Sequence, residues 1–80
     1  MLKSEEMRVA RDLINRFGLD NDFTVNSLKS AVSAYEWEVD KEEAPRLDCL
    51  SSAIRSLCGA LIQQRFGARK VPPELVLQRA

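Results

Sequence analysis

Large apolar residues recur along the second half of the chain at alternating spacings of three and four. The members of this large stripe are Leu47, Leu50, Ile54, Leu57 and Leu61. A helix with 3.6 residues per turn brings positions with these spacings onto one side. The pattern therefore predicts an amphipathic helix near residues 45–66 that packs its large stripe against another helix.

The same predicted helix carries a second row of smaller side chains. This small stripe consists of Cys49, Ala53, Ser56 and Ala60, spaced four, three and four apart. Small side chains allow two helices to approach closely. We expect this helix to be central to the fold, and its small stripe to mediate self-association.

Apolar periodicity also predicts a first helix near residues 4–17. Ser4 is expected to cap it, with Glu5 and Glu6 near its positive end. Gly18 is expected to close it in the left-handed conformation, with Leu19 folding back onto the helix.

A second helix is predicted near residues 24–39. We expect Thr24 to cap it and Phe23 to pack on Leu28 as a hydrophobic staple. Its buried side is expected to contain Val25, Leu28, Val32, Tyr35 and Val39. An acidic stretch, residues 36–43, follows at the negative end of the helix and predicts either fraying or a basic partner.

The last segment, residues 68–80, contains two consecutive prolines that interrupt helicity. Its aliphatic side chains, Leu75, Val76 and Leu77, are expected either to close the bundle or to dock on a second molecule. The chain is therefore predicted to be one all-α domain, residues 1–80. Its architecture is expected to be a small three-helix bundle with a proline-led C-terminal segment.

Composition and charge limit the chemistry of this 80-residue chain. Its net charge is zero, with two basic against seven acidic residues over 19–43 and six basic against two acidic over 44–80. A neutral chain of mixed sign is a poor general binder of nucleic acid, because phosphate contacts need accumulated positive charge. The absence of histidine and of a Gly-rich phosphate loop argues against an enzyme and against a cofactor.

No metal is expected either. A zinc site would lack most of its usual ligands, since the chain has two cysteines and no histidine. Residues 20–22 faintly resemble a calcium loop, but the later glycine and the final glutamate are missing.

The two cysteines, Cys49 and Cys58, are separated by roughly 13 Å of predicted helix and point to different sides, so they are not expected to bond. Free thiols suggest a reducing compartment. The first residues lead into a charged amphipathic stretch rather than an apolar run, and no segment has transmembrane length. We therefore expect a cytoplasmic protein.

Trp37 lies roughly 140° around its helix from Val32, away from the predicted buried side. Two interpretations remain open: it covers the small stripe within the chain, or it is an exposed anchor for a partner. The acidic residues beside it would steer a basic protein towards the site. The candidate partner-binding residues are Trp37, Glu36, Glu38, Asp40, Leu75 and Leu77.

Residues 14–32 also have the outline of a helix-turn-helix, with a glycine and a short turn between two helices. The link from Gly18 to Thr24 is about one residue too long for the tight form, and an ordinary helical hairpin is the better explanation of the pattern. The candidate nucleic-acid contacts are Arg8, Arg11, Arg16, Lys29, Arg69 and Lys70.

Together these observations favour a non-enzymatic protein–protein interaction module that self-associates as a homodimer or other homo-oligomer. It would act as a small adaptor, accessory subunit or inhibitor of a larger intracellular partner. The alternative is a small helix-turn-helix-like DNA-binding regulator.

Overall fold

The computed structural model describes residues 1–41 and 44–76. It contains helices α1 (Ser4–Phe17), α2 (Phe23–Val39) and α3 (Ala44–Phe66), followed by the 3₁₀ turn η1 (Pro73–Leu75). Within the described ranges there is no strand. The predicted all-α class and small three-helix bundle are confirmed, and the predicted helix ends agree to within one residue.

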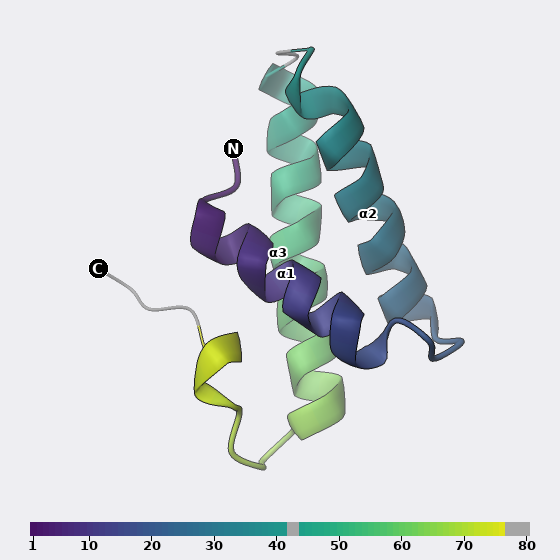
Figure 1. Cartoon of the computed structure of the whole chain (residues 1–80), viewed down its shortest axis with the longest axis vertical. Coiled ribbons are helices and arrows are strands. Elements are labelled where there is room, and N and C mark those ends of the chain that lie inside the picture. Colours follow the sequence, from purple (N-terminus) through teal and green to yellow (C-terminus); the bar gives the residue numbers. More distant parts are fainter. Residues whose placement is uncertain (42–43, 77–80) are drawn as a thin grey trace.

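The helices form a thin slab. Figure 1 shows α2 and α3 lying side by side and antiparallel, with α1 crossing obliquely over one side of this pair and η1 beside α1. The molecule measures 39 × 34 × 16 Å along its principal axes. The fold is therefore a two-helix layer with a third helix on one of its sides.

The core lies where α1 crosses the other two helices. Each helix contributes a fully buried large residue, such as Leu13 from α1, Leu28 from α2 and Ile54 from α3, all with 0% exposure. Burying an aliphatic side chain of this size contributes about 1.5–3 kcal/mol of transfer free energy. These three positions are where substitutions should cost most.

The buried side of α3 differs from the predicted large stripe. Its buried residues are Leu47, Ser51, Ile54, Cys58 and Leu61, whereas Leu50 and Leu57 are only partly buried. The centre of burial is rotated by about 40° from the predicted centre. The reason is that α1 and α2 flank α3 from two sides. Ser51 is tolerated there because its hydroxyl donates to the Leu47 carbonyl oxygen at 2.7 Å.

Both predicted N-terminal caps are wrong by one or two residues. Lys3, not Ser4, precedes α1, and its N–H donates to the Glu6 carboxylate at 2.9 Å. Asp22 caps α2 by accepting hydrogen bonds from the backbone N–H groups of the residues two and three positions later. A carboxylate is a stronger acceptor than a threonine hydroxyl and complements the positive helix end. Phe23 then becomes the first helical residue and is 85% exposed, so the predicted staple does not form.

The left-handed ending predicted at Gly18 is also wrong. Gly18 has φ −66°, and Leu19 is fully exposed rather than folded back. Gly67 has the left-handed conformation instead, with φ 54° at the end of α3. Gly18 is needed for a different reason: a Cβ there would lie 2.3 Å from the Ile14 carbonyl oxygen.

Alanine substitutions at Gly18 and Gly59 are expected to have opposite effects on the stability of the fold. We expect Gly18→Ala to destabilise the fold by about 1–3 kcal/mol, because backbone must move to relieve the overlap. Gly59→Ala is the matched control, since a Cβ at this helical position meets nothing within 4 Å. It should stabilise the fold by about 0.5–1 kcal/mol through lower backbone entropy in the unfolded chain. Urea unfolding measures both values, and a stable Gly18→Ala variant would contradict the prediction.

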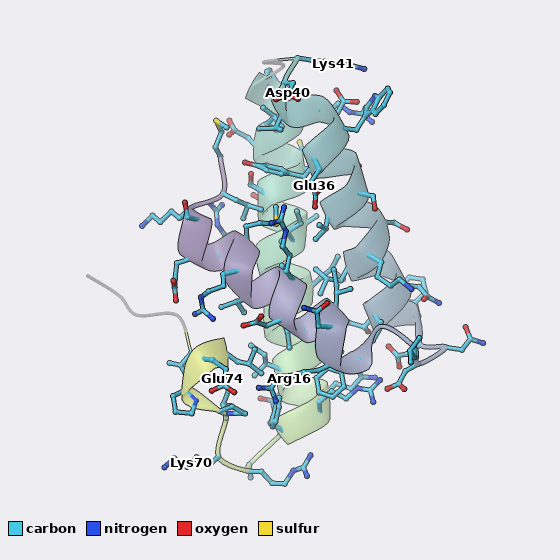
Figure 2. All side chains as sticks on the ribbon, in the orientation of Figure 1. Arg16, Glu36, Asp40, Lys41, Lys70 and Glu74 are labelled. Atoms are coloured by element: carbon cyan, nitrogen blue, oxygen red, sulfur yellow. The ribbon has the colours of Figure 1, made fainter. Side chains whose placement is uncertain are left out.

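The C-terminal segment closes against α1. Leu75 is 1% exposed, so it belongs to the core and its predicted partner-binding role is corrected. The Arg8 guanidinium donates to the Glu74 carbonyl oxygen at 2.7 Å, and Arg16 forms an ion pair with the Glu74 carboxylate, as Figure 2 shows. Leu77, the other aliphatic candidate of this segment, lies outside the described residues.

Candidate functional site

The side of the α2–α3 layer turned away from the core is the candidate site. We call it the outer face. Every member lies two residues before or after a buried residue of the same helix. These residues are Phe23, Ser30, Ala34 and Trp37 from α2 and Cys49, Ala53, Ser56 and Ala60 from α3.

Helix geometry sets this orientation. Two residues correspond to about 200° of rotation, or 160° by the shorter path, so a residue two positions from a buried one points almost directly outwards. Ser30 and Ala34 flank buried Val32 in this way, and Ser56 and Ala60 flank buried Cys58. The small stripe predicted on α3 and the predicted anchor Trp37 therefore both point away from the core.

Two large aromatic side chains stand among the small ones. Trp37 is 69% exposed and Phe23 is 85% exposed. Of the two interpretations of Trp37, the exposed position is therefore observed, and Trp37 does not cover the small stripe. Sequence reasoning missed Phe23 because it was assigned to a staple. The signal was its spacing of 14 residues from Trp37, which brings the two to neighbouring angles around one helix.

The acidic candidates are largely engaged within the chain. Glu36 pairs with Arg11 at 3.4 Å, between α2 and α1. Glu38 pairs with Arg46 at 3.1 Å, between α2 and α3. These ion pairs engage two of the five carboxylates of residues 36–43, which reduces the negative charge that would steer a basic partner.

The end of α2 beside Trp37 keeps a pair of opposite charges. Figure 2 shows Asp40 and Lys41 together at this end of the helix. The Lys41 ammonium lies 4.5 Å from the centre of the Trp37 ring, a cation–π contact. The lysine covers part of the indole while leaving it accessible.

The cationic candidates do not form an open basic surface. Arg8 pairs with Glu5 and Asp12, Arg11 with Glu36, and Arg16 with Glu74. Hydrogen bonds to backbone carbonyl oxygens engage two more of the predicted set, Lys29 and Arg69. Among the described residues, no hydrogen bond or ion pair joins Lys70 to the other members, and it lies in the segment between α3 and η1. Three of the six cations face carboxylates and two more bond backbone carbonyl oxygens, so few of them are left for phosphate contacts.

The two cysteines occupy different environments. Cys49 is exposed on the outer face, whereas Cys58 is buried, and both are free thiols. Burial, together with the nearby Glu6 carboxylate, raises the pKa of Cys58 to about 11. At about pH 8 roughly one in a thousand Cys58 thiols is then ionised.

This difference predicts selective thiol labelling. At low protein concentration we expect Ellman's reagent to modify one thiol rapidly and the second at least 100-fold more slowly, because only a thiolate with solvent access reacts. Cys49→Ser should abolish the rapid phase, and denaturant should expose the second thiol. Equal rates for the two thiols in the native protein would contradict the burial of Cys58.

Two of the hollows beside α1 differ in size and lining. One of about 760 Å³ opens between α1 and α2 and is lined by arginine and carboxylate side chains that pair with one another. The other, of about 160 Å³, lies between α1, α3 and η1 and is mainly apolar. Among the described residues, neither lining supplies an activated nucleophile or an unpaired acid–base couple.

Two further findings concern metals and membranes. Across residues 1–41 and 44–76, no three acidic or cysteine side chains gather closely enough to hold a metal ion. No helix in the same ranges combines the length and the apolar character needed to cross a bilayer.

Comparisons with protein-family models, curated proteins and solved structures found no match to this chain. The proposals below therefore depend on the geometry of the chain itself.

Proposed function

We propose that this protein is a non-enzymatic protein–protein interaction module that binds through the outer face. The observation that carries the proposal is the exposed Trp37, which stands beside a row of small side chains. Tryptophan is the residue type most enriched among binding hot spots, and its surrounding contacts exclude water when a partner docks.

The composition of the outer face supports this proposal. None of its eight members is charged, although charged residues make up 30% of the chain. Depletion of charge with enrichment in aromatics is typical of the centre of an interface. Small residues between the aromatics permit a partner helix to approach to about 8 Å between axes. The face therefore suits an α-helical partner.

The DNA-binding alternative has weaker support. Three of its arginines face carboxylates of the same chain. On α2, the helix that would read bases, the exposed residues of the base-reading types between the two aromatics are Asn26 and Lys29, and the Lys29 ammonium donates to the Gly18 carbonyl oxygen at 3.0 Å. Base reading relies on arginine, lysine, asparagine and glutamine side chains. Association with a protein is the better explanation of this surface.

Fluorescence of the only tryptophan in the chain tests the exposure of the proposed anchor. In the dilute protein we expect Trp37 emission at the wavelength of solvated indole and full access to an aqueous quencher. Blue-shifted, protected emission at low micromolar concentration would contradict the anchor.

A capture experiment tests the function itself. Tagged wild-type protein should retain a specific protein from a lysate of the source cells, and Trp37→Ala should reduce retention at least tenfold, about 1.4 kcal/mol or more. Val76→Ala is the matched control, because Val76 is also an exposed apolar residue but lies beside η1. Equal capture by wild type and Trp37→Ala would count against the proposed site.

A further inference from the structure

We infer that the partner on the outer face is a second copy of this chain, related by a twofold axis that crosses α2 and α3 at mid-length. This inference rests on the proposed function and names its partner. In the pair, α2 packs antiparallel on α2 of the second copy, and α3 packs antiparallel on its own counterpart. Such an interface is isologous, so each stripe must complement itself.

The α2 part of the outer face has this self-complementarity. Phe23 and Trp37 lie seven residues before and after Ser30. A twofold axis at Ser30 therefore places the phenyl ring of each copy against the indole of the other, at both ends of the contact. Ser30 meets its own counterpart at the centre, where a small residue is needed for close approach.

The small stripe on α3 is symmetric in the same way. Its inner members, Ala53 and Ser56, and its outer members, Cys49 and Ala60, share one midpoint between residues 54 and 55. An axis at that midpoint pairs Cys49 with Ala60 of the second copy and Ala53 with its Ser56. All four contacts then join small side chains.

A single twofold axis can pass through both helices because the midpoint on α2 and the midpoint on α3 lie at the same height along the α2–α3 hairpin. Arg46 pairs with Glu38 at one end of the hairpin, at 3.1 Å, and the Gln64 amide donates to the Asp22 carboxylate at the other end, at 2.9 Å. The position halfway between these contacts is Ser30 on α2 and the middle of the small stripe on α3. The sequence does not require this coincidence, which arises from the register of the hairpin.

Electrostatics favour the antiparallel over the parallel arrangement of α2. Acidic side chains gather at the C-terminal end of α2, which has no basic residue in its last turn. A parallel pair would place these two acidic ends against each other, whereas the antiparallel pair separates them by the length of the helix.

The available area indicates a weak dimer. α2 has 17 residues, hence a length of about 25 Å, and two adjacent helices are about 20 Å wide. The footprint is then on the order of 500 Å² per copy, below the roughly 800 Å² of a standard interface. We therefore expect a dissociation constant in the micromolar range, about 10–100 μM.

Disulfide trapping of the full chain tests this arrangement. Ala60→Cys keeps Cys49 in place, and the twofold axis brings these two positions of opposite copies to a Cα separation of about 4–6 Å. Mild oxidation at about 200 μM protein should convert most of this variant to a covalent dimer with two intermolecular disulfides. The two positions are roughly 16 Å apart within one chain, which excludes an internal bond.

Matched variants distinguish the antiparallel twofold pair from other arrangements of two copies. The wild-type chain should remain uncrosslinked, since the two copies of Cys49 would be about 16 Å apart. Ala60→Cys combined with Cys49→Ser should not crosslink, whereas Ser30→Cys combined with Cys49→Ser should. Trapping of the wild-type chain through Cys49 would indicate a parallel pair and would overturn the inference.

Sedimentation equilibrium provides the independent readout. A dimer that forms above about 10–100 μM supports the inference, and a monomer up to about 500 μM overturns it. If the chain is monomeric but captures a different protein in a Trp37-dependent manner, the second copy is the wrong partner and the proposed function stands. If Trp37→Ala alters neither capture nor dimerisation, both proposals fail.

Discussion

Replacing Leu13 with alanine is expected to lower the free energy of unfolding by about 2–5 kcal/mol, enough to populate the unfolded state near 37 °C. The buried side of α1 consists of three residues, Val9, Ala10 and Leu13, of which Leu13 is the largest. Removing it leaves a cavity where α1 crosses α2 and α3, in addition to the lost transfer free energy. The free energy of unfolding of an 80-residue domain is about 4–12 kcal/mol in total, so this loss is a large fraction of it.

Thermal and urea unfolding followed by circular dichroism measure the effect. We expect the Tm of Leu13→Ala to fall by roughly 10–30 °C. Leu19→Ala is the matched control, because the same side chain is removed at a fully exposed position. It should change stability by less than about 0.5 kcal/mol. Equal stabilities of the two variants would show that α1 does not dock as described.

Replacing Ala34 with arginine is expected to weaken self-association at least 100-fold without destabilising the monomer. Ala34 is partly buried on the outer face, and in the proposed pair it faces residues 26 and 27 of the second copy. A guanidinium at a close helix contact must be desolvated without a carboxylate to pair with, and its bulk also prevents close approach. Arginine forms helix well, so α2 itself should be retained.

Asn15→Arg provides the control for this variant. Asn15 is exposed on α1, on the other side of the molecule, and the substitution adds the same charge. Its dimerisation constant should match that of the wild type within about twofold. If Ala34→Arg dimerises as well as Asn15→Arg, the outer face is not the contact.

Helix positions could be predicted from the sequence because several local signals agreed. Apolar periodicity gave the lengths, and Pro45 and Gly67 marked the start and end of α3, where the structure has them. The errors came from competition between neighbouring residues. Asp22 displaced Thr24 as the α2 cap, and as a result Phe23 moved from a predicted core contact to the surface.

The candidate site was harder to predict because it depends on where each neighbour packs. Periodicity identified the small stripe and separated Trp37 from the buried side of α2. It did not specify whether Trp37 would cover the small stripe within one chain, or that burial on α3 would shift to include Ser51 and Cys58. Leu75 shows the same limit, since only the path of the chain after Gly67 brings it onto α1.

The 16 Å thickness of the molecule has a consequence for heat resistance. Two slabs stacked back to back would be about 32 Å deep, close to their other dimensions of 39 and 34 Å, and would expose less area for their volume. A chain that gains part of its interior from a copy of itself melts at a temperature that rises with its own abundance. Its tolerance of warm conditions would then depend on how much of it a cell makes.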